Sequence, residues 1–324
     1  MIQPVKLFEL VNNSLANLSY PSRPEGLYDP IAYVLSLGGK RIRPILLLMA
    51  YNLYRDDIEK ALPAAIGLEM YHNYTLLHDD LMDCANLRRG HATVHKKWNA
   101  NTAILSGDTM MVLAYRHFLG IQLPAAQAAL RLFTKTAIEI GEGQQFDMNF
   151  EKRTDVSEEE YIEMIRLKTS VLLACALKCG AILAGAGDED SEHLYRLGEH
   201  IGLAFQLQDD YLDVYGNSEV FGKNIGGDIL CNKKTYMLIY AYSMATPEQR
   251  RELDRWLQAT DYDPAEKIAA VTGIYNEVGV DKAVRQLIEK YFSEGLEHLD
   301  KVSLPASSKQ ELLRYITSML NRKY

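Results

Sequence analysis

Apolar residues recur at three- and four-residue spacing along most of this 324-residue chain, and alternating strand patterns are absent. This spacing places apolar side chains on one face of an α-helix. It predicts helices over residues 45–49, 61–77, 161–184, 193–215 and 283–299. Ser157 followed by Glu160 predicts a capped helix start rather than a domain boundary. We therefore expect one all-α domain over residues 1–324, a helical bundle around a central cavity.

The same motif, DDxxD, follows the predicted helix 61–77 and occurs again within the predicted helix 193–215. Its acidic residues are Asp79, Asp80 and Asp83 in the first copy and Asp209, Asp210 and Asp213 in the second. Residues i and i+4 lie one turn apart on one helix face, so each copy forms a ladder of carboxylates. Neighbouring carboxylates repel one another, and oxygen-only ligands favour a hard cation such as Mg²⁺. Two ladders facing each other would bind a metal cluster, and such a cluster requires a polyanionic ligand.

Two other interpretations of the motif are an exposed acidic helix face and a calcium-binding loop. The first motif follows residues 74–77 and the second follows residues 203–207, which are apolar segments rather than polar ones. A calcium loop of the EF-hand type requires Gly at its sixth position and Glu at its twelfth. Counted from Asp79, these positions hold Cys84 and Gly90, so the calcium loop is excluded.

Basic residues cluster near the first motif, in the segments Gly38-Gly39-Lys40-Arg41-Ile42-Arg43-Pro44 and Leu87-Arg88-Arg89-Gly90. Arginine binds two phosphate oxygens with its planar fork, whereas lysine acts as a point charge. One anionic ligand could then be held by metal ions on the carboxylate ladder from one side and by these basic residues from the other. The alternative for Lys40 to Arg43 is a helix start whose charges reach solvent.

These motifs together resemble the trans-isoprenyl diphosphate synthase family. The resemblance is carried by GGKRIRP, LLHDDLMD with LRRG, GQQFD (143–147), KT (168–169), FQLQDDYLD, and GKNIGGD (222–228) with NKKT. They occur in family order from about residue 38 to residue 235. The resemblance implies an isoprenoid-synthase-type helical bundle. It also implies a short-chain prenyltransferase of the farnesyl and geranylgeranyl diphosphate synthase type.

The implied reaction joins isopentenyl diphosphate to an allylic diphosphate and releases diphosphate. Three Mg²⁺ ions per active site assist ionisation of the allylic substrate, the double bond of isopentenyl diphosphate attacks the cation, and a proton is lost to the released diphosphate. No nucleophilic Ser or Cys is required. The resemblance further implies a homodimer.

Family positions assign roles to individual residues. The implied direct metal ligands are Asp79, Asp83 and Asp209, with Asp80, Asp210 and Asp213 as additional or supporting groups. The implied allylic diphosphate contacts are Arg88, Lys168, Lys223 and Lys233. The implied isopentenyl diphosphate contacts are Lys40, Arg43, His72 and Arg89. Gln144, Asp147, Thr169, Phe205 and Gln206 match positions on the allylic side. The alternative for His72 is that it packs in the core and does not contact the substrate.

Product length is expected to depend on residues preceding the first motif. Tyr71, Thr75 and Asp79 lie in one i, i+4 line, and Tyr74 lies on an adjacent face. Thr75 is small enough to let a growing chain pass, whereas the two tyrosines would stop it further down. This predicts a C15 to C20 product, with C20 favoured. The alternative is that both tyrosines only pack in the core.

Two departures from the family pattern and two competing functions bear on this assignment. The first motif lacks the two extra residues that some bacterial relatives have, and Gly227 stands where some relatives have Lys. A terpene cyclase of related fold needs no isopentenyl site, so GGKRIRP and Arg89 argue against it. A non-catalytic regulatory subunit typically loses one Asp motif, whereas this chain keeps both.

Composition adds further expectations. The net charge of −8, with no basic block, makes nucleic acid an unsuitable partner. The apolar run 171–177 is interrupted at Lys178, so we expect no membrane span. The first nine residues lack the pattern of a signal peptide, which indicates a cytoplasmic protein. Cys175 and Cys179, four residues apart, are expected to be buried small side chains.

Overall fold

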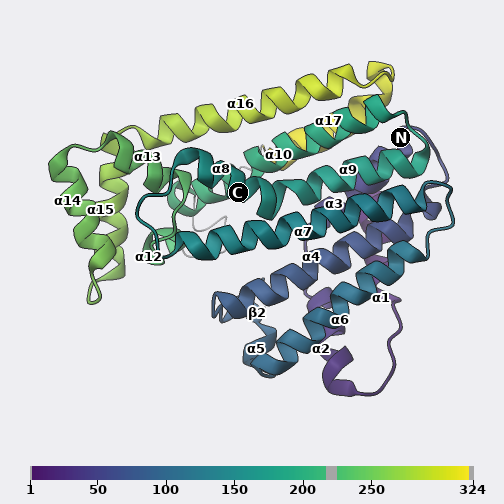
Figure 1. The fold of residues 1–324 in the computed structure, drawn as a ribbon, viewed down its shortest axis with the longest axis horizontal. Helices are drawn as coiled ribbons and strands as arrows, with labels where there is room; N and C mark the ends of the chain where they lie inside the picture. Colours follow the sequence, from purple (N-terminus) through teal and green to yellow (C-terminus); the bar gives the residue numbers. More distant parts are fainter. Residues whose placement is uncertain (1, 217–224, 321–324) are drawn as a thin grey trace. The chain divides into compact units, whose positions relative to one another are not determined.

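The computed structural model describes residues 2–216 and 225–320, and these form an almost entirely helical protein (Figure 1). This confirms the all-α prediction. The first elements are α1 (Pro4–Ala16), α2 (Glu25–Ser36), α3 (Ile42–Asn52), η1 (Ile58–Lys60), α4 (Leu62–Met82), β1 (Leu87–Arg88), β2 (His91–Ala92), α5 (Val94–Lys97), α6 (Ala100–Leu119) and α7 (Ala126–Phe150). They are followed by α8 (Glu158–Ile165), η2 (Arg166–Ser170), α9 (Val171–Ala184), α10 (Asp188–Tyr215), α12 (Gly227–Leu230), α13 (Tyr236–Met244), α14 (Pro247–Gln258), α15 (Pro264–Glu277), α16 (Val280–Lys301) and α17 (Ala306–Leu320).

The predicted helices are present with shifted ends. Helix α3 begins at Ile42, so Pro44 lies within its first turn, where the missing N–H costs nothing. Helix α8 starts with the predicted capping box, in which the Ser157 side chain accepts from the Glu160 backbone N–H. The expected helix over 161–184 is interrupted by η2, a π-helical turn over Arg166–Ser170. Such turns are frequently found at functional sites.

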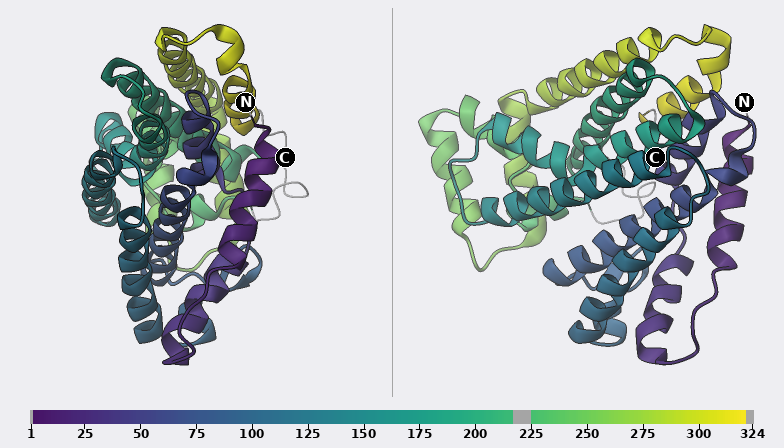
Figure 2. Two further views of the ribbon diagram at one scale, coloured as in Figure 1. Left: turned by 90° about the vertical axis from the view of Figure 1, so that its right-hand side faces the viewer. Right: turned by 45° about the vertical axis from the view of Figure 1, so that its right-hand side comes forward.

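By its contacts the chain divides into two compact units, each of which is described separately. The first comprises Met1–Thr134, Cys175–Leu194 and Val302–Leu312. Within it, α6 packs along α4 and α2 (Figure 2). Helix α3 is buried on all sides, and Gly180 of α9 packs so closely on it that a Cβ would lie 2.1 Å from the Leu47 carbonyl oxygen. Only glycine permits this approach.

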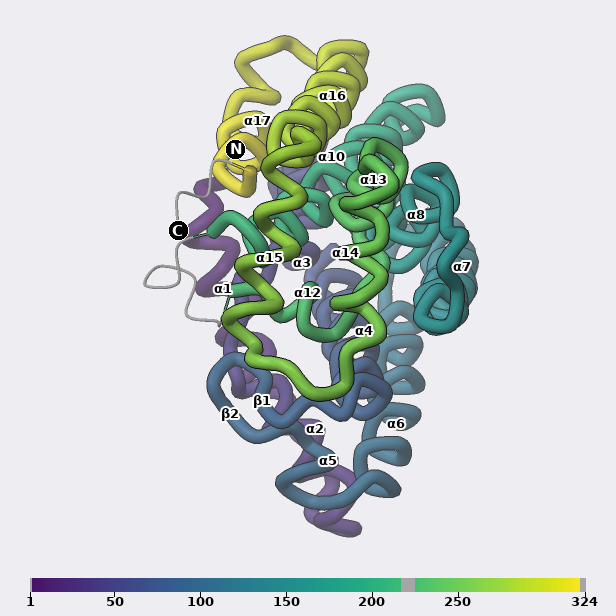
Figure 3. The backbone as a smooth tube through the Cα atoms, turned by 90° about the vertical axis from the view of Figure 1, so that its left-hand side faces the viewer, coloured from purple at the N-terminus to yellow at the C-terminus, as the bar shows by residue number. Residues whose placement is uncertain are grey.

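The second unit comprises Lys135–Ala174, Tyr195–Lys301 and Leu313–Tyr324. Within it, α15 contacts α12, α13, α14 and α16 (Figure 3). One apolar cluster here contains Leu253 and Trp256 of α14, Val271 of α15 and Val280 of α16. A second cluster surrounds the C-terminal half of α10 and includes Leu207 and Tyr161. The single-domain interpretation of residues 1–324 stays a prediction.

One helical segment, Glu158–Ala184, is long and apolar enough to cross a membrane by length and composition. Lys178 interrupts the apolar run 171–177, yet an 18-residue window of this segment still has a mean hydropathy of 1.7. However, 78% of that window is buried inside the protein. A buried core helix passes the same test of length and composition.

Candidate active site

The first Asp-rich motif closes helix α4 in the first unit. Asp79 and Asp80 lie in its last turn, and Asp83 is the residue that caps it, with its N–H donating to the Asp79 carbonyl at 2.8 Å. The sequence predicted the ladder, but Asp83 ends the helix rather than lying inside it. Asp80 is buried, Asp79 is half-buried and Asp83 is exposed. The first and last carboxylates of the ladder are therefore its accessible members.

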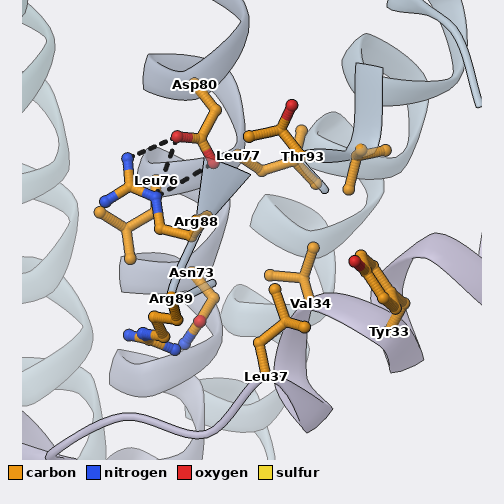
Figure 4. A pocket seen from close by; sticks show the side chains of 11 residues that line it. Tyr33, Val34, Leu37, Asn73, Leu76, Leu77, Asp80, Arg88, Arg89 and Thr93 are labelled. Carbon is orange, nitrogen blue, oxygen red and sulfur yellow. Dashed lines mark hydrogen bonds and ion pairs between the residues drawn. The ribbon is translucent and has the colours of Figure 1, made fainter. Parts of the chain in front are cut away.

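Arg88 binds the buried carboxylate of this motif. Its Nη2 donates to Asp80 Oδ1 at 2.6 Å and its Nε to the same oxygen at 2.9 Å (Figure 4). Burial raises the pKa of Asp80, and the Arg88 guanidinium acts in the opposite direction. Arg88 Nη2 also lies 3.9 Å from Asp79 Oδ2. A guanidinium thus sits directly against the first ladder.

Arg88 and Arg89 are presented by the hairpin of β1 and β2. The two turn residues, Arg89 and Gly90, have φ values of 54° and 79°. Two successive positive φ values are typical of the two-residue turn that suits the twist of paired strands. Arg89 then points to the basic loop, where its Nη1 donates to the Gly38 carbonyl. Gly39 has φ 133°, a backbone conformation that a residue with a Cβ rarely adopts, so glycine is favoured there.

His72 of α4 lies next to another predicted site residue. Its Nε2 is 3.1 Å from Arg43 Nη1. Burial and the positive charges of Arg43 and Arg89 hold the pKa of His72 well below its usual range. The ring is therefore neutral. Its Nε2 accepts a hydrogen bond from Arg43, so the hydrogen of the ring is on Nδ1. The first unit thus brings together Arg43, His72 and Arg89, three of the four residues predicted to bind isopentenyl diphosphate; Lys40 follows Gly39 in the same loop.

The second Asp-rich motif lies inside α10 of the second unit. Asp210 is buried; its Oδ1 accepts from Gln206 Nε2 at 2.9 Å, and its Oδ2 accepts from the Tyr161 hydroxyl. Burial raises the pKa of Asp210 to about 7, against the charge of Lys233 and these two hydrogen bonds. Asp213 Oδ2 accepts from the Asp228 N–H at 2.9 Å. Asp209 is half-buried.

The Lys168-Thr169 pair lies in the π-helical turn η2. Lys168 Nζ forms an ion pair with Asp147 of α7 at 2.6 Å. Thr169 Oγ1 donates to Gln206 Oε1 at 3.0 Å. Because Gln206 also donates to Asp210, a chain of hydrogen bonds links η2 to the second motif. Gly143, next to the predicted Gln144, lets α7 approach η2, since a Cβ there would lie 2.3 Å from the Lys168 nitrogen.

The segment after α12 carries Lys233. The Lys233 N–H donates to the Asp228 carbonyl, and its Nζ lies 3.7 Å from Asp228 Oδ1. Asn232, immediately before it, has a left-handed backbone with φ 55°. Lys223, also predicted to contact the allylic diphosphate, lies outside the described residues.

An aromatic cluster surrounds the residues predicted to control product length. The ring of Tyr71 lies 5.3 Å from Tyr74 and 5.2 Å from Phe133, centroid to centroid. Phe133 stacks on Phe118 at 4.2 Å. Tyr71 is buried, whereas Tyr74 and Thr75 are half-buried. Sequence reasoning missed Phe133 and Phe118, because nothing in their local sequence relates them to residues some 50 positions earlier.

Sequence reasoning also missed the partner of Asp210. Tyr161 is 49 residues away, and only the packing of α8 on α10 brings its hydroxyl to that carboxylate. Over residues 2–216 and 225–320, no three His, Cys, Asp or Glu side chains gather as a ready-made metal site. Phe205 lies on α10 immediately before Gln206.

The known proteins that this chain resembles belong to one class of enzyme. The family model described as polyprenyl synthetase matches residues 24–275. A geranylgeranyl diphosphate synthase of Methanosarcina mazei is 38% identical over 316 residues, covering 97% of this chain and 95% of the relative. A geranylfarnesyl diphosphate synthase of Natronomonas pharaonis is 37% identical, covering 96% and 94%. A crystal structure of a geranylgeranyl pyrophosphate synthase is similar over 100% of both chains, with a TM-score of 0.94 and 42% identity.

The fold and the two Asp-rich motifs are therefore those of a helical prenyltransferase. The chain belongs to the polyprenyl synthetase family. This confirms the resemblance that the motifs indicated and the isoprenoid-synthase type of the helical bundle.

Proposed function

We propose that this prenyltransferase condenses isopentenyl diphosphate with an allylic diphosphate to give a short all-trans prenyl diphosphate. One observation carries the proposal: both DDxxD motifs divide their carboxylates in the same way. The second Asp of each motif, Asp80 or Asp210, is buried and hydrogen-bonded to the protein. The first Asp of each motif, Asp79 or Asp209, is more accessible. A repeated division of this kind suits metal ligands supported by a fixed neighbour.

The donor set suits Mg²⁺, for which Asp79, Asp83 and Asp209 would be the protein ligands. Mg²⁺ is usually bound through a few carboxylates, with waters and phosphate oxygens completing its octahedral shell. We propose three ions per active site, as the family resemblance implies. When bound, the metal would neutralise charge that develops on the leaving diphosphate. Asp80, Asp210 and Asp213 would orient the ligands or their waters.

Four cations would bind the allylic diphosphate, namely Arg88, Lys168, Lys223 and Lys233. Arg88 suits this role because its ion pair with Asp80 fixes the guanidinium against the first ladder. Positive groups fixed before reaction stabilise the developing diphosphate charge without reorganising. Breaking the allylic C–O bond leaves an allylic cation. The Thr169 hydroxyl donates its hydrogen bond to Gln206 Oε1, so its lone pairs are available to face that cation.

Isopentenyl diphosphate would bind at Lys40, Arg43, His72 and Arg89. Neutral His72 would donate its Nδ1 hydrogen, while the arginines supply the positive charge. The double bond of isopentenyl diphosphate then forms the new C–C bond with the allylic cation. Loss of a proton, which we assign to the released diphosphate, restores a double bond. No side chain has to act as a nucleophile.

For product length we propose C15 to C20, with C20 favoured. The aromatic rings of Tyr71, Tyr74 and Phe133 lie within 5.3 Å of their neighbours and would form a floor below Thr75. The geranylgeranyl diphosphate synthase relatives support this length, whereas the geranylfarnesyl diphosphate synthase relative has a longer product in its name. Gln144 and Phe205 would line the path of the chain.

We also propose a homodimer in the cytoplasm, with no nucleic acid partner. Support for the dimer comes from α6, where Leu105, Val112 and Leu119 recur every seven residues. Their exposed fractions are 60%, 63% and 69%. A repeated stripe of large exposed apolar side chains is typical of an interaction face. A second copy of the chain would cover it.

The decisive experiment supplies purified protein and Mg²⁺ with isopentenyl diphosphate and, separately, dimethylallyl, geranyl or farnesyl diphosphate. Products are dephosphorylated and separated by chromatography. We expect all-trans alcohols of 15 to 20 carbons. Absence of any condensation product with all three primers would refute the proposal. A cyclic hydrocarbon formed without isopentenyl diphosphate would instead support a terpene cyclase.

A further inference from the structure

Arg41 lies between Lys40 and Arg43, yet its side chain is buried, with an exposed fraction of 4%. Its backbone is left-handed, with φ 51°, two residues after Gly39, and both Gly38 and Gly39 also have positive φ. A residue with a Cβ pays a steric cost in this conformation, whereas glycine does not. Contacts of the Arg41 side chain must therefore offset that cost.

The guanidinium of Arg41 is hydrogen-bonded in three directions. Nε donates to Asn12 Oδ1 at 3.0 Å, Nη1 to Glu69 Oε1 at 2.7 Å, and Nη2 to the Leu35 carbonyl at 2.8 Å. These partners come from α1, α4 and the end of α2. One buried side chain thus joins three helices to the loop that carries Lys40.

Glu69 extends the network along α4 to His72. Its Oε1 also accepts from Asn73 Nδ2 at 3.1 Å, and its exposed fraction is 2%. Asn73 follows His72, the ring that accepts from Arg43. The network therefore holds Arg41, two residues before Arg43, and Asn73, next to His72, through one buried ion pair.

We propose that Arg41 and Glu69 are positioning residues for isopentenyl diphosphate, an inference that rests on the function proposed above. A buried ion pair adds little net stability compared with apolar side chains of similar size, because desolvating the charges offsets their attraction. The geometry that the Arg41–Glu69 pair imposes explains its presence better than its contribution to stability does. The pair fixes the backbone from which Lys40 and Arg43 project, at a set distance from His72.

A second, independent observation assigns the same kind of role to Lys267 on the allylic side. Lys267 of α15 has an exposed fraction of 0%, and its Nζ donates to Asn232 Oδ1 at 2.7 Å. It also lies 4.4 Å from the Tyr262 ring centroid. Asn232 Nδ2 in turn donates to the Leu257 carbonyl at 3.0 Å. These contacts hold the left-handed Asn232, and so fix the backbone that leads into Lys233.

A crossed kinetic experiment tests both assignments. The variants are Arg41→Met combined with Glu69→Leu, which replaces the whole ion pair, and Lys267→Met. Arg55→Met, which removes an exposed ion pair with Asp57 in the first unit, is the matched control. Both substrates are varied in steady state, and binding of isopentenyl diphosphate alone is measured by calorimetry. Circular dichroism and cooperative urea unfolding establish that each variant is folded.

We expect the double variant to raise the KM and the Kd for isopentenyl diphosphate at least about tenfold, the effect of one displaced charged hydrogen bond. Its KM for the allylic substrate should stay within twofold. Lys267→Met should show the reverse, and the Arg55 control should match wild type. Arg41→Lys and Lys267→Arg, which keep the charge, should give smaller shifts in the same KM and serve as the test if an apolar variant does not fold.

The possible outcomes distinguish failure of the positioning roles from failure of the proposed function. If wild-type protein forms no product, the proposed function fails. If wild type is active but a folded double variant keeps its affinity for isopentenyl diphosphate, the role of Arg41 is overturned. Equal rises in both KM values would show an ordinary structural role and would also overturn it.

Discussion

Arg88 contacts both carboxylate oxygens of Asp80, with Nε at 2.9 Å from Oδ1 and 3.1 Å from Oδ2. The second Asp of the first motif therefore has its charge compensated by the protein itself. This leaves Asp79 and Asp83 as the members of the ladder that best suit a metal.

Asp79→Ala and Asp209→Ala should each lower kcat by at least about a hundredfold, because each would lose a metal ligand that stabilises the leaving diphosphate. Asp108→Ala, which removes an exposed carboxylate from α6, should keep wild-type activity. Chelation should abolish wild-type turnover, and Mg²⁺ should restore it. Urea unfolding should show no loss of stability in the apo variants, since a like-charged neighbour has been removed. Near-full turnover in either variant would contradict the assignment of metal ligands.

The two anion sites should separate in kinetics. Arg89→Ala or Lys40→Ala should raise the KM for isopentenyl diphosphate, and Lys233→Ala should raise the KM for the allylic substrate. One charged hydrogen bond is worth about 1.5–3 kcal/mol, or about ten- to a hundredfold in KM. Initial rates over a grid of both substrate concentrations measure the effect. Equal effects on both substrates in all three variants would rule out two distinct sites.

Product length should respond to the aromatic cluster on α4. Tyr74→Ala and Tyr71→Ala should lengthen the product, because each removes a ring from the proposed floor. Phe133→Ala should act in the same direction through its contact with Tyr71. Thr75→Phe should shorten the product. Tyr71→Phe, which keeps the ring, is the control and should leave the length unchanged. Chromatography of the dephosphorylated products decides, and unchanged lengths throughout would show that the rings only pack in the core.

Acid should weaken the fold through His72. Its pKa in the folded protein lies well below the value of about 6.5 in the unfolded chain. Below pH 6.5 the unfolded state binds a proton that the folded state does not, so stability falls as the pH falls through this range. The loss is at most about 1.4 kcal/mol per pH unit. The difference in unfolding free energy between wild type and His72→Gln should therefore shift against wild type between pH 7 and pH 5, as measured by urea titration. A difference that is constant with pH would contradict this account.

The stripe on α6 should carry the dimer contact. Val112→Glu places a charge at its centre and should shift the protein towards the monomer, because burying an unpaired carboxylate is costly. Sedimentation at micromolar concentration measures the shift. Lys135→Glu, at an exposed position on α7, tests whether any added negative charge has this effect. A wild-type monomer would refute the proposed interface.

The sequence alone predicts features that depend on local spacing. The ladder of Asp79 and Asp83, the capping box of Ser157 and the helical class all follow from residues a few positions apart. Contacts between distant segments could not be predicted in this way. The burial of Arg41 depends on Asn12 and Glu69, which belong to two other helices. An arginine in a basic run looks solvent-exposed until its partners are known.

The π-helical turn that contains Lys168 and Thr169 makes the site sensitive to the number of residues in this segment. Each residue of an α-helix turns the following side chain by about 100°. A π turn accommodates one extra residue and so changes the direction in which the residues before it face relative to those within it. Deleting Leu167 would turn Tyr161 by about 100° relative to Lys168, so the Tyr161–Asp210 and Lys168–Asp147 contacts could no longer form together, although neither pair had been altered. An insertion or deletion in this helix would therefore disturb the site even where every site residue is kept.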